Sequence, residues 1–459
     1  MKKYLPYLSV LIFLIVALIV DFSNHKWKRN EVLNYDIFGY HNYLPALIIY
    51  KDITKYNYLD SIERKYNPTN GAFNKYGLHP SPKDSNLCNQ YPIGVAIFQT
   101  PFFIVAHLWA TISKQDTPDG YSSPYQHAVV FSTLFFALLS LVVLIKFLQN
   151  YFSNPIIFFT ILLITFATNF FHYATLESGL SHIYQFFLYS TMLYLSVKWY
   201  LKANIYNSIY IGICIGLAIV TRPIDILICL IPLFWSNPKA FISKPQYLKN
   251  NLKYIFIIII FTFLSCLPQM LYWKYVTGNW IYYSYSSVDY FQFDRFRVIH
   301  GLFSYRKGWF IYTPLALIAF IQAYNIKATS STFFYKKIFW IFFIPIIYLV
   351  FSWHNWFYGW SYGCRALLGT IPLLAIPIAY FLQNTVQQKL YKKITTTIII
   401  IFITFLNLFQ TWQYEHYIIH GTLMNESIYW NLFLKTEKPK DLDKNFKLQE
   451  ELDWNTGGW

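Results

Sequence analysis

Long apolar runs alternate with short polar segments along most of the chain. About 20 consecutive apolar residues are needed for a helix to cross the hydrocarbon core of a bilayer. The pattern therefore predicts an all-α polytopic membrane bundle, because no soluble core needs so many uninterrupted runs. The clearest runs are Leu5–Val20, Ala128–Leu148, Pro155–Tyr173, Tyr254–Met270, Ile338–Phe351 with its flanks and Ile394–Thr411.

Composition supports this prediction. Hydrophobic residues make up 56% of the 459 residues and charged residues only 13%, whereas a soluble domain carries about 25% charged residues. The net charge of +16 raises the possibility of nucleic-acid binding, but the lysines cluster between the apolar runs, as cytoplasmic loops do. We therefore expect membrane lipids and no nucleic acid as partners. The lysines are Lys2, Lys3, Lys146, Lys198, Lys202, Lys239, Lys244, Lys249, Lys253, Lys327, Lys336, Lys337, Lys389, Lys392 and Lys393.

The first run has two interpretations. Lys2 and Lys3 resemble the charged start of a signal peptide, but no small-x-small cleavage site follows Val20, so an uncleaved first span is favoured. Lys26, Lys28 and Arg29 would then lie outside, against the positive-inside rule. The later lysine clusters outweigh them.

Residues 22–125 form a long outer loop by this topology. Its apolar stretch, Ile93–Ile112, is long enough to cross, but a single crossing there would move every later lysine cluster outside. We therefore expect membrane-surface helices near 92–112 and near 36–50, the latter with Tyr43, Leu47 and Tyr50 on one face. Residues 66–91 are rich in Asn, Pro and Ser and predict a loop.

The spans then alternate, which gives a domain of residues 1–415 with about 11 spans. A short non-cytoplasmic tail, 416–459, follows, and its part Glu437–Trp459 mixes acids and bases and predicts a small soluble appendage. The expected spans lie near 5–21, 126–147, 155–174, 181–199, 205–222, 224–236, 253–272, 309–325, 337–352, 366–382 and 394–412.

Polar residues on the outer side are the candidates for catalysis and binding. Asp36 opens the first surface helix, where it could cap the helix or act as a general base on an acceptor hydroxyl or amine. The turn 172–182 carries His172, Glu177 and His182, whose spacing is wrong for a compact zinc motif. Glu177 as an orienting residue and a merely solvated turn both remain open.

Several basic residues lie on the side where the topology disfavours them. Arg222, Arg306, Lys307 and Arg365 stand at outer span ends or in outer loops. Snorkelling to lipid headgroups or a salt bridge from Arg222 to Asp225 explains one such residue, whereas several convergent ones favour a phosphate-binding site.

Aromatic residues crowd two outer loops. His354 lies in the loop 353–362, and a second aromatic group spans 280–290. An interfacial belt explains most of these side chains, and stacking on sugars or lining a lipid groove is the alternative. Cys88 and Cys364 fall on the outer side, and their pairing is left open.

This arrangement resembles the GT-C superfamily of lipid-linked-sugar glycosyltransferases, in particular the protein-mannosyltransferase and aminoarabinose-transferase branch. The similarity covers roughly residues 1–415, with short motifs. They are Tyr35-Asp36-Ile37-Phe38-Gly39-Tyr40 leading into Tyr43-Leu44-Pro45-Ala46, Tyr91-Pro92-Ile93-Gly94-Val95, Thr221-Arg222-Pro223 and Gly359-Trp360-Ser361-Tyr362-Gly363-Cys364-Arg365.

The resemblance implies an inverting transfer of a sugar from a polyprenyl-phosphate donor to a glycan, lipid or protein acceptor. The site would face the periplasmic side of a bacterial inner membrane, with no cofactor. A divalent metal is not favoured, because Asp-x-Asp occurs only at Asp441 and Asp443 in the tail. Asp36 and Glu177 are then the candidate catalytic residues. The candidate substrate-binding residues are Tyr40, His172, His182, Arg222, Arg306, Lys307, His354 and Arg365.

Two other classes remain as alternatives. A transporter or flippase of lipid-linked glycans would show repeated halves and Gly/Pro-broken helices, and a polymerase or ligase would lack the early acidic loop. The chain has 17 glycines, long outer loops and no evident repeat.

Overall fold

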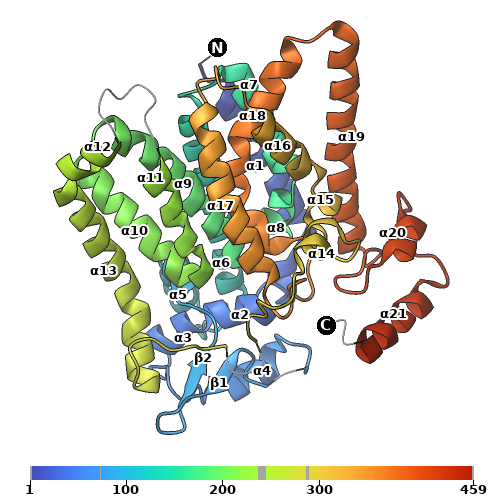
Figure 1. Cartoon of the computed structure of the whole chain (residues 1–459). Helices are drawn as coiled ribbons and strands as arrows, with labels where there is room; N and C mark the ends of the chain where they lie inside the picture. The colour runs from blue at the N-terminus through green and yellow to red at the C-terminus, as the bar shows by residue number, and fades with distance from the viewer. Residues whose placement is uncertain (1–2, 73, 236–243, 286–288, 457–459) are drawn as a thin grey trace. The chain divides into compact units, whose positions relative to one another are not determined.

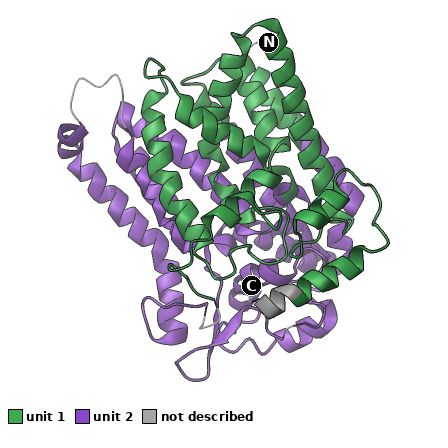
Figure 2. Ribbon diagram, turned by 45° about the vertical axis from the view of Figure 1, so that its right-hand side comes forward, with its two compact units in different colours: residues 1–13, 144–172, 289–459 green, residues 14–143, 173–288 purple. Residues whose placement is uncertain are grey.

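The computed structural model describes residues 3–72, 74–235, 244–285 and 289–456, with the side chains of 452–456 left out. Lys2 and Lys239 lie outside the described residues. The described chain is mostly α-helical (Figure 1). It divides into two compact units: unit 1 is Met1–Phe13, Leu144–His172 and Asp289–Trp459, and unit 2 is Leu14–Val143 and Tyr173–Val288 (Figure 2).

Seven helical segments in the described residues are long and apolar enough to cross a membrane, which supports an all-α membrane protein. Six of them match expected spans, and the seventh is α5. The other five expected spans are helical too, but they are shorter or less apolar. The seven segments are α1 with η1 (Leu5–Arg29), α5 (Gly94–Ser113), α6 (Ser123–Leu148), α13 (Leu252–Thr277), α17 (Phe333–Phe351), η3 with α18 (Arg365–Val386) and α19 (Leu390–Glu415).

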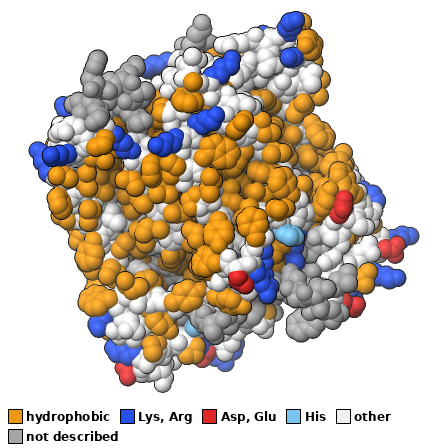
Figure 3. Space-filling view, viewed as in Figure 1, with side chains coloured by type: hydrophobic (Ala, Val, Ile, Leu, Met, Phe, Trp, Pro, Cys, Tyr) orange, Lys and Arg blue, Asp and Glu red, His pale blue; other side chains and the backbone are white. Residues whose placement is uncertain are grey.

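Unit 2 is built around α9 (Ser181–Leu201), α10 (Ile205–Thr221) and α13. The short η2 (Pro223–Cys229) and α11 (Leu230–Phe234) follow α10. Apolar side chains gather on the outer face of α13 (Figure 3), where Phe256, Ile259 and Phe263 are exposed. An apolar helix face open to the surroundings is what a lipid-facing helix requires.

Glycines bring α10 against α13. A Cβ added at Gly212 would lie 2.5 Å from the carbonyl oxygen of Ile258, and one at Gly216 would lie 2.6 Å from that of Thr262. The hydroxyl of Thr262 donates to the Gly212 carbonyl at 3.2 Å. Gly212 and Gly216 therefore form a small-xxx-small contact that lets two helix backbones approach closely.

Unit 2 has two chemically different ends. At its basic end the hydroxyl of Tyr247, in α12 (Lys244–Asn250), donates to the carbonyl of Trp199 at 2.7 Å, and Lys198, Lys249 and Lys253 lie nearby in the sequence. At the other end, the segment 25–93 packs against the end of α13, where Ser81 and Asn86 donate to the carbonyl of Val276. We call this second end the site end of unit 2 (Figure 1).

The expected surface helix near 36–50 forms as two helices, α2 (Tyr35–His41) and α3 (Tyr43–Ile48). Pro45 explains the break, because a proline lacks an N–H and its ring clashes with the carbonyl four residues earlier, here that of His41. The loop prediction for 66–91 was wrong in part. This stretch holds the hairpin of β1 (Leu78–Pro80) and β2 (Leu87–Asn89), in which His79 faces Cys88, and α4 (Leu59–Tyr66) precedes it.

The helix expected near 92–112 forms as α5. Gly94, at its start, lies against Thr221 at the end of α10. His107, more than three turns later, shares a 2.6 Å hydrogen bond with Tyr125 at the start of α6. Phe98 and Phe102 of α5 lie 4.9 and 6.4 Å, between ring centroids, from Phe136 of α6. The length and composition of α5 allow it to span, so its course as a surface helix stays a prediction.

Unit 1 contains α7 (Asn154–Phe166), α8 (Phe170–Thr175, divided between the units at His172), α16 (Pro314–Asn325), α17, α18 (Ala375–Val386) and α19. Lys336 and Lys337 stand in the first turns of α17, and Lys392 and Lys393 in those of α19. The opposite ends of α17 and α19 lead into the loops that carry the candidate residues. We call these the basic end and the site end of unit 1.

The end of the tail, Glu437–Trp459, was expected to be a small soluble appendage, but apolar residues of the described tail are packed into unit 1. Ile418, Leu423 and Met424 are buried in one cluster with Tyr312 and Tyr362. Leu442 and Phe446, from α21 (Leu442–Thr456), join the same cluster, and α20 (Glu426–Leu432) lies between. These apolar positions precede or interrupt the charged stretch, which is why the charge pattern alone was misleading.

Candidate functional site

Asp36 is held by two tyrosines at the site end of unit 2. Its Oδ1 accepts a hydrogen bond from the hydroxyl of Tyr91 at 2.7 Å and another from that of Tyr76 at 3.0 Å. Asp36 lies in the first turn of α2 and is half-buried, while Asn34 is the N-cap residue. The helix dipole favours an acid in this first turn and two phenol hydroxyls bind it there, so a general-base role for Asp36 stays a prediction beside the structural one.

Tyr91 is fixed in place by its surroundings. A Cβ at Gly39 would lie 2.2 Å from its ring, and one at Gly77 would lie 2.7 Å from it, so both positions require glycine. The ring of Tyr40 lies 4.6 Å away. Burial and the carboxylate of Asp36 raise the pKa of the Tyr91 phenol well above its ordinary value. Tyr91 therefore stays protonated and acts as a donor to Asp36.

The turn after α8 packs next to Asp36. Gly179, at a φ of +107°, lies against Ile37 and Val129, where any side chain would clash. The ammonium of Lys26 donates to the carbonyl of Leu176 at 2.7 Å, and Glu177 follows. The hydroxyl of Tyr40 donates to Ser181 Oγ at 3.5 Å, the long limit of a hydrogen bond. Tyr40 and the Glu177 turn are thus neighbours of Asp36 within unit 2.

His182 and Arg222 lie at the same end. His182 Nδ1 lies 3.4 Å from Gln185 Oε1, and the amide of Gln185 donates to Asp225 Oδ2 at 2.7 Å. Tyr189 donates to the other oxygen of Asp225 at 3.0 Å. Arg222 is the C-cap residue of α10, directly after the Thr221 that contacts Gly94. Asp225 is thus bound by uncharged groups, beside the cation at the helix end.

The site end of unit 1 carries a second group of cations. Lys307 is only 3% exposed, and its ammonium donates to the backbone oxygen and the hydroxyl of Ser361. The guanidinium of Arg306 stacks over Phe357, 3.9 Å from the ring centroid. Arg365 is half-buried and begins η3 (Arg365–Leu374). Desolvated cations bind anions more strongly than exposed ones do, so this region suits phosphate chemistry.

The histidines are placed differently from one another. His354 lies 3.4 Å from Asp289 and stacks on Tyr290. His172 is fully buried against Tyr362 and Tyr414 of unit 1, so it belongs to a core and not to a solvated turn. The idea that His172, Glu177 and His182 share a metal gains no support. No group of three or more His, Cys, Asp or Glu side chains among the described residues could hold a metal ion.

Sequence reasoning missed three contributors. Tyr76 and Tyr91 were hidden in a segment predicted as loop, although Tyr91 stands in one of the motifs quoted above. His420, in the tail, lies 4.3 Å ring to ring from Trp360 and accepts backbone N–H groups of Thr422 and Leu423. Burial, with the charges of Lys307, Lys438 and Arg306, lowers the pKa of His420 to about 4.

Within unit 2 the structure thus places Asp36, Tyr40, Glu177, His182 and Arg222 at one end, and within unit 1 it places Arg306, Lys307, His354 and Arg365 at one end. Cys88 and Cys364 are both free thiols, as are Cys214, Cys229 and Cys266. Comparison of the chain with protein-family models, with curated protein sequences and with solved structures finds no match.

Proposed function

We propose that this chain is an inverting membrane glycosyltransferase that transfers a sugar from a polyprenyl-phosphate donor, with Asp36 as the general base. The observation that carries the proposal is the pair of tyrosine hydrogen bonds on Asp36 Oδ1. A carboxylate fixed through one oxygen by side-chain hydroxyls has a defined orientation, which a general base needs. The proposal includes the finer topology, with about 11 spans, a GT-C-like fold and the site ends outside the cytoplasm.

The reaction proceeds by one displacement. The acceptor oxygen or nitrogen attacks the anomeric carbon, and its proton passes to the Asp36 carboxylate. The bond from the anomeric carbon to the phosphate oxygen breaks on the opposite face, so the configuration inverts. The leaving group departs as the polyprenyl phosphate anion. Tyr76 and Tyr91 position the carboxylate, while Tyr40, Glu177 and His182 orient the sugar or the acceptor.

Cations stabilise the departing phosphate in this scheme. The negative charge on the leaving oxygen grows as the bond breaks, so a fixed positive charge lowers the barrier most in the transition state. Arg222 is the candidate in unit 2. It follows Thr221, which contacts Gly94, and Gly94 lies shortly after Tyr91 in the sequence. Arg306, Lys307, Arg365 and His354 of unit 1 are candidates for the same role or for sugar binding.

The test measures polyprenyl phosphate, which the reaction releases whichever acceptor receives the sugar. Membranes containing the chain are supplied with a panel of polyprenyl-phosphate hexoses and pentoses together with candidate acceptors, and the polyprenyl phosphate released is measured by mass spectrometry. We expect Asp36→Asn to lose release by about two to four orders of magnitude, the usual contribution of a general base, while donor binding is kept. Asp60→Asn, a carboxylate exposed on α4, is the matched control.

Two outcomes contradict the proposal. Full release by Asp36→Asn would exclude Asp36 as the base. Movement of lipid-linked glycan between the leaflets of liposomes, with no release for any donor, would identify a transporter or flippase instead.

A further inference from the structure

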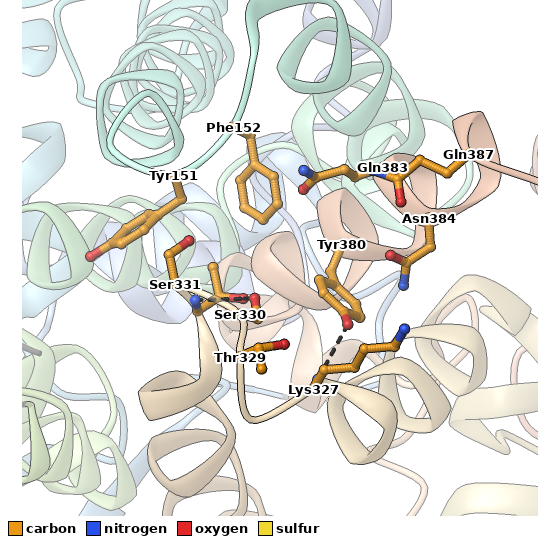
Figure 4. A pocket seen from close by; sticks show the side chains of 11 residues that line it. Tyr151, Phe152, Lys327, Thr329, Ser330, Ser331, Tyr380, Gln383, Asn384 and Gln387 are labelled. Atoms are coloured by element: carbon orange, nitrogen blue, oxygen red, sulfur yellow. Dashed lines mark hydrogen bonds between the residues drawn. The ribbon is translucent and has the colours of Figure 1, made fainter.

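A hollow of about 320 Å³ lies at the basic end of unit 1, away from the candidate residues. Its walls come from the end of α18, from the connection between α16 and α17 and from the connection between α6 and α7 (Figure 4). Tyr380, Gln383, Asn384 and Gln387 lie on one face of α18, at the spacing of a helix stripe. Hydroxyl-bearing residues of the α16–α17 connection form another wall.

The lining is rich in hydrogen-bond donors. Among the described residues, the side chains of Lys327, Gln383, Asn384 and Gln387 make no hydrogen bond or ion pair with the protein, although all four border the hollow. The backbone N–H of Lys327 donates to the hydroxyl of Tyr380 at 3.2 Å, which fixes the start of the connection beside α18 (Figure 4). An ammonium and three carboxamides are therefore available to a ligand.

The charged residues in the sequence around this hollow are all cationic. The chain contains no Asp or Glu between Asp294 and Glu415 and none between Asp119 and Glu177, so no carboxylate of these segments can neutralise the lysines of the basic end. Lys336, Lys337 and Lys389 add to the field around the hollow. A ligand of this hollow must therefore carry negative charge and must also offer groups for the carboxamides and hydroxyls.

The location selects a lipid among such ligands. The hollow lies at the end of α17 and α18, two of the segments that are apolar enough to cross a membrane. Tyr151, on its border, contacts Phe334 at 6.0 Å between ring centroids, as in an interfacial aromatic layer. We propose that this hollow binds the headgroup of an anionic glycerophospholipid whose phosphodiester carries a polyol, with Lys327 on the phosphate and the carboxamides of α18 on the hydroxyls.

This inference does not depend on the proposed glycosyl transfer. The test is native mass spectrometry of the delipidated full chain in detergent, titrated with phosphatidylglycerol, with phosphatidylcholine and with soluble glycerol 3-phosphate. One lysine at an anionic lipid surface contributes about 1 kcal/mol, so we expect Lys327→Gln to weaken phosphatidylglycerol binding about fivefold. Lys389→Gln, at the same end but outside the hollow, lowers the surrounding field without removing a contact, so it should weaken binding less.

Three results would overturn the inference. They are equal binding of phosphatidylglycerol and phosphatidylcholine, equal losses in Lys327→Gln and Lys389→Gln, and binding of glycerol 3-phosphate as tight as that of the lipid. The last would indicate a free phosphorylated polyol as the ligand. Asn384→Leu keeps the charge and removes the carboxamide, so it tests the hollow even if the lysine variant fails to fold. We expect it to lose the preference for phosphatidylglycerol over an anionic lipid without a polyol headgroup, phosphatidic acid.

Discussion

Asp36 and Asp119 both lie in the segment 22–125, yet their environments differ. Asp119 Oδ1 accepts the backbone N–H groups of Tyr121 and Ser122, and its Oδ2 accepts from Tyr66 and pairs with Lys65 at 2.9 Å. Such a carboxylate holds a loop in shape. Asp36 accepts from two phenol hydroxyls, which fix its orientation. Sequence position could not predict this difference, because Tyr76 and Tyr91 stand 40 and 55 positions after Asp36.

Tyr91→Phe tests the positioning of Asp36. The variant removes one of the two donors to Oδ1 and keeps the ring, so the protein should fold. A hydrogen bond to a charged group contributes about 1.5–3 kcal/mol, so we expect release of polyprenyl phosphate to fall about 10- to 100-fold. Donor binding, measured by lipid retention in native mass spectrometry, should stay the same.

Tyr283→Phe is the control, because Tyr283 is exposed at the same end of unit 2. A Tyr91→Phe protein with normal release, or one that loses donor binding in step with release, would show that Tyr91 does not act through Asp36.

His41 gives a prediction about pH. Burial between Phe103 and Tyr121 lowers the pKa of His41 to about 4, although its hydrogen bond with the Gly120 carbonyl at 2.7 Å opposes the shift. Between pH 6.5 and 4 the unfolded state binds a proton and the folded state does not. Stability is therefore complete above about pH 6.5 and falls by up to about 3 kcal/mol as the pH drops to 4.

We expect His41→Gln to flatten this part of the curve when the Tm of the detergent-purified protein is measured from pH 7 to 4.5. His416→Gln, at an exposed position, should follow the parent curve. Parallel curves for the parent and His41→Gln would contradict the assignment.

At the scale of elements, the apolar periodicity predicted where helices form better than how they end and pack. The surface helix near 36–50 was predicted as one helix, whereas Pro45 divides it. The hairpin β1–β2 was hidden because its strands have three residues each, too few for an alternating pattern. The contact of α10 with α13 could have been expected from Gly212-Ile213-Cys214-Ile215-Gly216, a spacing typical of close helix pairs.

Gly212→Ala and Gly216→Ala test that contact, because the direction of the change in Tm distinguishes a close contact from an isolated helix. In an isolated helix, alanine is more favourable than glycine by about 1 kcal/mol. Here the new Cβ would meet the backbone of α13, and overpacking costs about 1–3 kcal/mol. We therefore expect both variants to lower the Tm, whereas Tyr210→Ala, on the exposed face of α10, should change it little. A raised Tm for either glycine variant would mean that the two helices can separate at no cost.

At the scale of the whole molecule, the sequence was sufficient to predict a helical membrane protein. It could not count the spans, because α9 is not apolar enough, and α7, α10, η2 with α11, and α16 are too short, to meet the length and composition of a span. It also could not bring the candidate residues together, since His172 and His182 are separated by ten positions yet belong to different units.

The topology of α5 is the decisive measurement at this scale. In a chain whose five cysteines are replaced by serine, Asp60→Cys and Gln115→Cys stand before and after α5 at exposed positions. We expect a membrane-impermeant thiol reagent to label both from the same side of sealed vesicles, and Lys249→Cys from the other. Labelling of Asp60→Cys and Gln115→Cys from opposite sides would show that α5 crosses.

The segment without carboxylates has a consequence for the orientation of unit 1. Its six lysines at the basic end are matched by nearly as many cations towards the other end, namely Arg295, Arg297, Arg306, Lys307 and Arg365. A transmembrane voltage acts on each charge with about 2.3 kcal/mol per 100 mV, so its effects on the two ends almost cancel. The electrical potential across a membrane therefore does little to orient this segment, and packing must hold the cations of the site end in place.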